Sequence, residues 1–227
     1  MILLALLLVP AVASALAYFV AQKFRASLLL LAALSHVLLV GALWASPGHR
    51  LWDGWLADDA LGRVILSIVS LVFLVLAHYA VGYLREQDPR GGRAFVSCML
   101  AFLAAATLVS LSQHFALLWI GMETTTLAVA PLIYHRHDRR SLEAVWKYLV
   151  LSSVGIAFAL LGVFLLATSQ PASAGRPLVL DDMTLHATAL NPVWLRAAFV
   201  FMLIGFGTKM GLAPLHSWKP DVYGEAP

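Results

Sequence analysis

The membrane character of the chain is clearest in residues 194–218, which read WLRAAFVFMLIGFGTKMGLAPLHSW. A helix that crosses the hydrocarbon layer needs about 20 mostly apolar residues, and this stretch is long enough. Lys209 is a charge in its interior, and Pro214 and the glycines around that lysine disfavour a straight helix. The stretch therefore predicts a membrane-spanning helix that is broken near Lys209.

The whole chain has the same composition. Of its 227 residues, 61% are hydrophobic and 12% are charged, and the mean hydropathy is +0.86. A soluble domain carries about a quarter charged residues, so these values exclude a water-soluble fold. The apolar runs are apolar on every face, whereas the strands of a membrane barrel alternate apolar and polar residues. The sequence therefore predicts helices rather than strands.

Other apolar stretches supply six further spans. Ala94–Tyr134 contains one charge, Glu123, and is too long for a single crossing, so we divide it at a tight turn near residues 110–114. The prediction is an all-α membrane protein with about seven transmembrane helices, the seventh of them broken. Four stretches each predict one crossing: Ile2–Gln22, Ala26–His49, Val64–Leu84 and Tyr148–Gly175.

Cysteine content and motifs exclude several kinds of site. The single cysteine, Cys98, cannot hold an iron–sulfur cluster, form a tetrahedral zinc site or close an intrachain disulfide. The sequence has no phosphate-binding nucleotide loop, no metal-ligand cluster and no evident nucleophile with a base. We therefore expect no cofactor, no metal and no catalysis by this chain alone.

The basic residues predict how the chain is oriented. One set of connections between spans holds ten of them, and the alternate set holds four among several aspartates. Lys and Arg accumulate on the cytoplasmic side, so we expect a multi-pass protein of the cytoplasmic membrane with its N-terminus outside. The long connection Ser169–Val193 then lies outside, and we interpret it as a linker. The ten are Lys23, Arg25, Arg85, Arg90, Arg93, Arg136, Arg139, Arg140, Lys147 and Lys219.

Two charges lie inside predicted spans: Glu123 in the fifth and Lys209 in the seventh. A charge there costs about 2.5–3.5 kcal/mol on insertion scales, so it is kept where protein or water solvates it. The pair is either a structural ion pair or a route for protons or ions. Pro131 and Pro214 lie close by and favour the second interpretation, because such helix defects expose backbone carbonyls to a polar cavity. We also expect Gly207 and Gly211 to permit close helix packing.

The remaining titratable residues have simpler interpretations. His36 and His78 are expected to be neutral and hydrogen-bonded inside the bundle, with proton relay as the alternative. His114 and His216 stand at the ends of spans. Each is interpreted equally well as the mouth of a hydrated path or as a residue solvated at the membrane interface. Glu143 and Lys147 have the spacing of a helical ion pair. The hydroxyls of Thr124, Thr125 and Thr126 either hydrogen-bond to their own helix or hold water.

Three segments resemble motifs of antiporter-like membrane subunits. This family is shared by proton-pumping NADH:quinone oxidoreductase, multisubunit Na+/H+ antiporters and membrane-bound hydrogenases. The longest segment resembles the broken seventh helix of the family, although Lys219 stands where the family has an apolar residue. Within the family, the likeness is greatest to the hydrogenase 4 membrane component F group. The segments are IGFGTKMGLAPLHSWKPD with YGEAP (204–221, 223–227), WIGMETTTL (119–127) and SLEAVWKYL (141–149).

This resemblance implies roles for particular residues. Glu123 and Lys209 correspond to the proton-translocating pair of the family, Lys147 to a basic position, and His216 lies within the motif. Lys147, His216 and His114 are thus candidates for a proton relay. The resemblance also implies a partial antiporter-like fold that corresponds to the N-terminal half of the family. Residues 1–93 would form a three-helix segment, and residues 94–227 the first, incomplete part of the helix repeat.

The expected function is that of a membrane subunit in a redox-driven complex, of the hydrogenase or NADH:quinone oxidoreductase type. It would translocate protons through Glu123 and Lys209 while other membrane and peripheral subunits perform the redox chemistry. Two alternatives remain open: a subunit of a Na+/H+ antiporter without a redox partner, and a scaffold that conducts nothing. Loss of proton movement without loss of assembly in a Lys209 variant distinguishes the first hypothesis from the scaffold.

Overall fold

The fold is a bundle of long helices. The computed structural model describes residues 1–86, 91–171 and 175–227. In these ranges seven helices are long and apolar enough to cross a membrane, which confirms the predicted fold class. Arg90 of the basic set lies outside the described residues. The seven helices are α1 (Ile2–Phe19), α2 (Gln22–Ala45), α3 (Ala60–Glu86), α4 (Gly91–Leu111), α5 (Phe115–Ile133), α6 (Arg139–Thr168) and α8 (Pro192–Met210).

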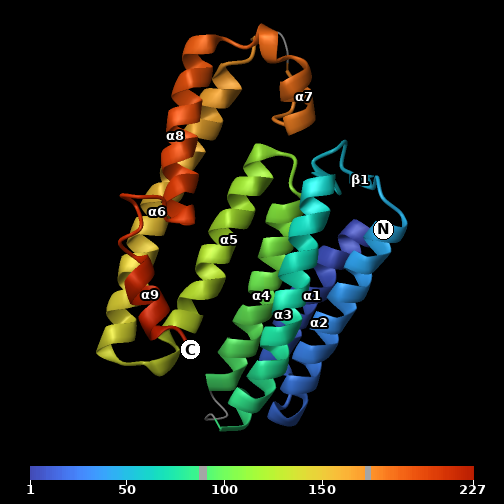
Figure 1. Cartoon of the computed structure of the whole chain (residues 1–227), viewed down its shortest axis with the longest axis vertical. Helices are drawn as coiled ribbons and strands as arrows, with labels where there is room; N and C mark the ends of the chain where they lie inside the picture. The colour runs from blue at the N-terminus through green and yellow to red at the C-terminus, as the bar shows by residue number, and fades with distance from the viewer. Residues whose placement is uncertain (87–90, 172–174) are drawn as a thin grey trace.

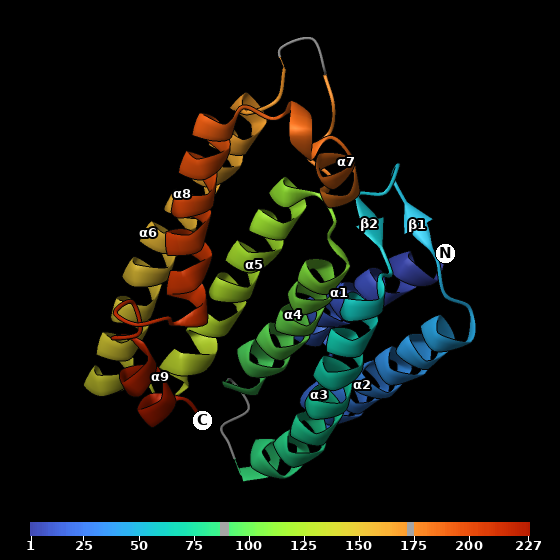
Figure 2. The ribbon, with the colours of Figure 1, turned by 45° about the horizontal axis from the view of Figure 1, so that its top comes forward.

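The bundle has two groups of helices with α5 between them. Helices α1 to α4 lie side by side, α6 and α8 form a close antiparallel pair, and α5 packs against both α4 and α6 (Figures 1 and 2). Small side chains such as Ala17 and Ala77 and large ones such as Leu100 fill the core of the first group, each fully buried. The two groups meet along α5, the helix that carries Glu123.

The predicted division of residues 94–134 is confirmed. Helix α4 ends at Leu111 and α5 begins at Phe115. The turn is held by a short hairpin of β1 (Arg50–Leu51) and β2 (Leu56–Ala57), because the amide of Gln113 donates to the carbonyl of Trp55 at 2.8 Å. The hairpin lies at the same end of the bundle as the N-terminus (Figure 2).

The connection after α6 is more than a linker, so that interpretation is wrong. Its described part contains α7 (Leu180–Leu185) and the 3-10 helix η2 (Ala187–Ala189). It returns to the α4–α5 turn, where Leu178 accepts from the amide of Phe115 at 3.0 Å and Leu180 donates to Gln113 at 2.9 Å. Met183 is 6% exposed and packs with α6 and α8. The connection was misread because its many small residues hide these few apolar anchors.

Glycines set the distance between α6 and α8, but they are not the expected ones. A Cβ atom on Gly205 would collide with the backbone of Ala159 and Gly155, and one on Gly155 would lie 2.7 Å from the Thr208 side chain. A Cβ atom on Gly207, in contrast, would meet only the flexible Leu212 side chain, at 3.3 Å. The close packing therefore depends on Gly155 and Gly205, which face each other across the helix pair.

The predicted break in the seventh spanning helix is confirmed. Helix α8 ends at Met210, and Gly211 adopts the left-handed conformation at φ +68°. The chain then runs without regular helix to α9 (Lys219–Glu225). Pro214 lies in this connection, after the end of the helix, so it is not a defect within α8. The helix ends because Gly211 readily adopts the left-handed conformation that reverses the chain.

The connection is tied back to the end of α8. Leu212 donates its amide to the carbonyl of Gly207 at 2.9 Å, and the indole of Trp218 donates to the carbonyl of Thr208 at 3.1 Å. These two bonds satisfy carbonyls that the end of a helix leaves without partners. Trp218 is buried, and it packs beside Ile133, Ala144 and Val222. The break is thus an ordered element that holds the last turn of α8, and with it Lys209.

Candidate functional site

Lys209 is the centre of the candidate site. It occupies the last turn of α8, and its amine points to α5 and α6. The Nζ atom donates to Thr126 Oγ1 at 2.6 Å and to Tyr148 Oη at 2.9 Å. It also lies 5.1 Å from the centroid of the Tyr148 ring, within the range of a cation–π contact. One amine therefore joins three helices.

The threonines after Glu123 do hydrogen-bond to their own helix. Thr124 donates to the carbonyl of Ile120 at 2.8 Å, and Thr125 and Thr126 donate to that of Met122 at 2.7 and 3.2 Å. Because the Thr126 proton is used in this way, its lone pairs face the amine of Lys209. Thr124 is exposed, whereas Thr126 is fully buried. Thr126 thus both caps a backbone carbonyl and accepts from the lysine.

Glu123 stands one turn before Thr126 on α5. Within the described residues, its buried Oε2 atom has no hydrogen-bond partner, and no ion pair of 4.0 Å or less joins it to Lys209. Its carboxylate nevertheless acts electrostatically on Lys209 and Tyr148. The two charges thus lie in one region of the bundle interior without direct contact, so the structural ion pair left open by the sequence is not formed in this structure.

Ser152 lies at the level of Glu123 on the neighbouring helix. Helices α5 and α6 run antiparallel, and the indole of Trp119 donates to the carbonyl of Ile156 at 2.8 Å. Glu123 follows Trp119 by four residues and Ser152 precedes Ile156 by four, so this register brings them to one level. Ser152 is 1% exposed, and its hydroxyl has no partner in the described part of the chain. Two buried polar atoms without partners in the described residues, Glu123 Oε2 and Ser152 Oγ, therefore belong to residues at one level of α5 and α6.

Tyr148 and Ser152 are site residues that sequence reasoning missed. Tyr148 is 3% exposed, and its ring packs on Trp218 with 5.3 Å between centroids. A usable signal was present: Tyr148, Ser152 and Gly155 recur at a spacing of four and three residues, which places them on one face of a helix. That face is the one toward α5 and α8.

Lys147 is adjacent to Tyr148 in sequence but belongs to a different cluster. Its amine pairs with Glu143 at 2.6 Å, as the spacing predicts, and also with Asp221 of α9 at 2.8 Å. The lysine side chain is 43% exposed. This ion-pair cluster fastens α9 to the start of α6. His216 is exposed in the connection between α8 and α9, where its carbonyl accepts from the amide of Lys219.

His114 lies at the other end of α5 from the break. It is 8% exposed, its ring stacks on Trp55 with 4.2 Å between centroids, and its Nδ1 atom accepts from the amide of Ala116 at 3.2 Å. The imidazole therefore acts as the N-cap of α5. Burial lowers the pKa of His114 below its ordinary value. The structure thus separates this relay candidate from Lys209.

The two histidines within spans differ. His36 is fully buried between Ser70 and Thr107, at 2.6 and 2.9 Å. Thr107 donates to Leu103, so it accepts from His36 Nε2, and Ser70 donates to Nδ1. This is the expected neutral, hydrogen-bonded histidine. The prediction of a hydrogen-bonded histidine inside the bundle is wrong for His78. This residue lies on an outward face of α3 and is exposed.

Comparisons with known proteins show a family match and several similar proteins. Residues 112–227, which include Glu123 and Lys209, match the protein family described as NADH:quinone oxidoreductase/Mrp antiporter, TM. The chain is 33% identical over 178 residues to a hydrogenase-4 component F homolog of Methylacidiphilum infernorum, covering 74% of this chain and 37% of that protein. It is 31% identical over 177 residues to NADH-quinone oxidoreductase subunit N of Halorhodospira halophila, covering 78% of this chain and 36% of that one.

Two solved structures have the same fold. A chain of the archaeal membrane-bound sulfane sulfur reductase aligns with a TM-score of 0.86 at 20% identity, covering 99% of this chain and 48% of that one. A chain of respiratory complex I from Thermus thermophilus aligns with a TM-score of 0.81 at 23% identity, covering 100% and 48%. The chain thus spans about half the length of these two chains and little more than a third of the two curated relatives.

Proposed function

The chain belongs to the NADH:quinone oxidoreductase/Mrp antiporter family of multi-pass membrane proteins, and on this premise we propose that it moves protons through Glu123 and Lys209 as a membrane subunit of a redox-driven complex. The observation that carries the proposal is the environment of Lys209. Its amine binds two neutral hydroxyls, Thr126 and Tyr148, while Glu123, whose Oε2 atom is buried, stands one helical turn from Thr126 without pairing directly with the lysine.

The two hydroxyls suit a lysine that gains and loses a proton. When Lys209 is protonated, the hydroxyl oxygens of Thr126 and Tyr148 both accept hydrogen bonds from its ammonium group. When Lys209 is neutral, the Tyr148 hydroxyl can turn and donate its proton to the lone pair of the amine nitrogen, while Thr126 continues to accept from an N–H group of the amine. The site therefore keeps hydrogen bonds in both protonation states, so neither state is left unsatisfied inside the bundle. A permanent ion pair would stabilise the charged form alone.

Glu123 supplies the switch in this proposal. A carboxylate close to the amine favours the ammonium form, and a carboxylate that moves away or takes up a proton releases it. Buried polar atoms are commonly satisfied by water, so Glu123 Oε2 and Ser152 Oγ fit a water molecule between α5 and α6. Such a water would connect the carboxylate to the lysine by hydrogen bonds and give the proton a path between them.

In this proposal, further titratable groups extend the proton route beyond Glu123 and Lys209. The ion-pair cluster of Lys147, Glu143 and Asp221 lies toward the start of α6, where half-exposed charges can exchange protons with water. His216 lies exposed beside the break. His114 would serve the opposite end of α5. We propose these residues as relay positions, with Glu123 and Lys209 as the coupled pair.

The proposed setting follows from charge and family. The excess of Lys and Arg at the ends that carry the starts of α2 and α6 supports a cytoplasmic location for that side, with the N-terminus outside, in the cytoplasmic membrane. The named relatives are a hydrogenase component and a quinone oxidoreductase subunit, which supports other membrane and peripheral subunits as partners. In this proposal those partners carry the electrons.

The test uses the assembled complex in sealed vesicles. Lys209→Met should abolish proton movement driven by the electron donor while subunit composition stays unchanged. Lys23→Met removes a lysine from the start of α2 and should leave proton movement intact. Unchanged pumping in the Lys209 variant would refute the mechanism, and loss of assembly in place of flux would favour the scaffold. Sodium-dependent flux without any electron donor would favour the antiporter alternative.

A further inference from the structure

Trp218 contacts both sides of the hydrogen bond between Lys209 and Tyr148. Its indole Nε1 atom donates to the carbonyl of Thr208, the residue directly before Lys209, at 3.1 Å. Its ring packs on the ring of Tyr148, with 5.3 Å between the centroids. The Tyr148 hydroxyl accepts from Lys209 Nζ at 2.9 Å. One side chain therefore connects the backbone that carries the lysine with the phenol that receives its hydrogen bond.

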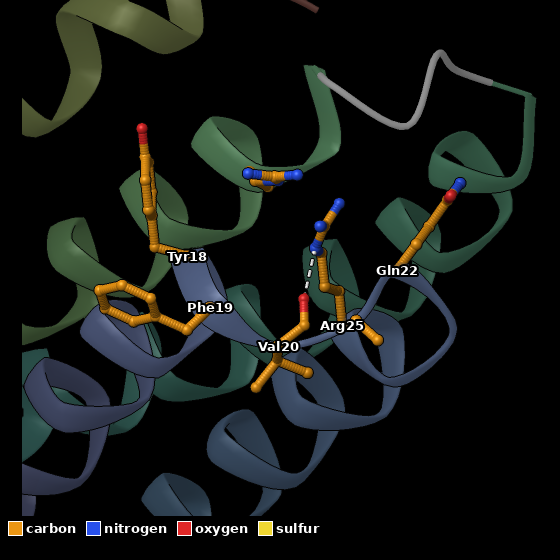
Figure 3. A pocket seen from close by; sticks show the side chains of 7 residues that line it. Tyr18, Phe19, Val20, Gln22 and Arg25 are labelled. Carbon is orange, nitrogen blue, oxygen red and sulfur yellow. Dashed lines mark hydrogen bonds between the residues drawn. The ribbon is translucent and has the colours of Figure 1, made fainter.

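Side chains that bind carbonyls at helix ends also occur elsewhere in the bundle. At the turn between α1 and α2, the Nε atom of Arg25 donates to the carbonyl of Val20, the C-cap of α1, at 3.2 Å (Figure 3). The residues around that turn, such as Tyr18 and Gln22, are not residues of the candidate site. Trp218 makes the same kind of bond at the end of α8, but its ring also contacts a site residue. Its bond can therefore affect the site as well as the stability of the helix end.

The position of Trp218 is fixed by α9, of which it is the N-cap. Trp218 is 7% exposed, and Val222, one turn later, packs in the same buried cluster with it and Tyr148. Asp221 of α9 pairs with Lys147, the residue next to Tyr148 on α6, at 2.8 Å. An ion pair and an apolar contact thus attach α9 to α6, and this attachment holds the indole against Tyr148.

The strength of the bond between Lys209 and Tyr148 depends on its geometry, because hydrogen bonds weaken with length and misalignment. A hydroxyl binds an ammonium group more strongly than a neutral amine, so a well-aligned bond favours the protonated lysine. In the described part of the chain, the charged or titratable groups around this bond are Glu123 of α5, Tyr148 itself on α6 and, over the Trp218 ring at 5.9 Å, the amine of Lys219.

We propose that Trp218 is a positioning residue for the proton step, because it fixes the geometry in which Tyr148 accepts from Lys209. This inference rests on the proposed function, since it concerns the same lysine. Trp218 itself takes up no proton, because its indole is a donor only. A tryptophan with a purely structural role would affect folding and assembly but would leave the protonation of Lys209 as it is.

The test measures the pH dependence of donor-driven proton movement by the assembled complex in sealed vesicles. Trp218→Phe keeps an aromatic ring beside Tyr148 and removes the bond to Thr208. The pH at which the rate is half-maximal should fall by about 0.5–1 unit, which corresponds to a three- to tenfold weaker hold on the proton. Trp146→Phe is the matched control, because Trp146 is a tryptophan of α6 that is 68% exposed, and its profile should equal that of the wild type.

A double variant shows whether Trp218 acts through Tyr148. Tyr148→Phe removes the hydroxyl and should shift the pH profile by itself. Adding Trp218→Phe to Tyr148→Phe should cause no further shift, because the bond that Trp218 positions is then already absent. Shifts of the two single variants that add in the double variant would overturn the proposal.

Lys209→Met in the same vesicles separates this inference from the proposed function. If Lys209→Met abolishes proton movement and Trp218→Phe keeps the wild-type pH profile, the positioning role is refuted while the proposed function stands. If proton movement persists in Lys209→Met, the proposed function itself fails. Rates are referred to the amount of assembled complex. A loss of assembly in Trp218→Phe with an unchanged profile of the assembled fraction would show a structural role alone and overturn the proposal.

Discussion

Lys209 donates its shortest hydrogen bond, 2.6 Å, to Thr126, a residue that stands one helical turn after Glu123 on α5. The lysine is thus held by the helix that carries the carboxylate, although the two charges are not paired directly. A hydroxyl acceptor fixes the amine near Glu123 without neutralising it. Neither group depends on the other for its position, which is what the proposed switch requires.

Replacing Thr126 tests this arrangement directly. Thr126→Val keeps the shape of the side chain but removes the acceptor for Lys209. A hydrogen bond to a charged group contributes about 1.5–3 kcal/mol, so we expect proton movement to slow by about tenfold or more. The matched control is Thr124→Val, because Thr124 also donates to its own helix but is exposed. Equal pumping rates for the two variants in vesicles would contradict the role of Thr126.

Ser152→Ala tests the proposed water between α5 and α6. Removing a buried hydroxyl that has no protein partner should leave the melting temperature unchanged or raise it, since no protein hydrogen bond is lost. If the hydroxyl holds a water beside Glu123, proton movement should nevertheless fall several-fold. Ser153→Ala is the control, because Ser153 is adjacent and exposed. A fall in stability together with flux would indicate a packing role and contradict the proposal.

The sequence was sufficient for the number of spanning helices but not for their ends. The apolar stretch beginning at Tyr148 predicted the sixth span, whereas α6 begins at Arg139, because Asp138 and Ser141 form a capping box there. The amide of Ser141 donates to the Asp138 carboxylate at 2.7 Å, and this bond lowers the pKa of Asp138. A stretch without charged residues shows which part of a helix can lie in lipid. The helix itself can continue into the neighbouring charged residues where its end is capped.

The partners of Lys209 could not be read from the sequence for a different reason. Lys209 and Glu123 are the two charges that the sequence placed inside predicted spans, so charge alone selected them. Tyr148 reaches Lys209 across the α6–α8 contact, whose separation Gly155 and Gly205 set, and Thr126 reaches it from α5, which packs on α6. The site therefore depends on a contact between helices that the hydropathy of the sequence does not reveal. The sequence drew attention to Gly207 and Gly211 as the residues of close packing, whereas Gly155 and Gly205 form that contact.

Gly205→Ala should be strongly destabilising. The added Cβ atom would meet the backbone of Ala159 and the carbonyl of Gly155, which cannot move aside as a flexible side chain could. Overpacking of this kind costs about 1–3 kcal/mol. Gly41→Ala, near the C-terminal end of α2, meets nothing within 4 Å and should be neutral or slightly stabilising. Thermal unfolding in detergent compares the two variants, and equal melting temperatures would contradict the close contact of α6 with α8.

His114 predicts a pH dependence of stability. Its burial against Trp55 lowers its pKa, so in the range just below the ordinary histidine value of about 6.5 the unfolded chain binds a proton that the folded chain does not. Stability should therefore be unaffected by this group at high pH and should fall as the pH drops below that value. His114→Asn keeps a residue that caps helices but does not titrate, so this part of the acid sensitivity should disappear.

The control is His137→Asn, because His137 is exposed at φ +53° and asparagine tolerates that backbone conformation. Melting temperatures between pH 5 and 8 compare the three proteins. An unchanged pH profile in His114→Asn would show that protonation of this imidazole does not oppose folding, which would require the ring to be solvated at the start of α5 rather than packed on Trp55.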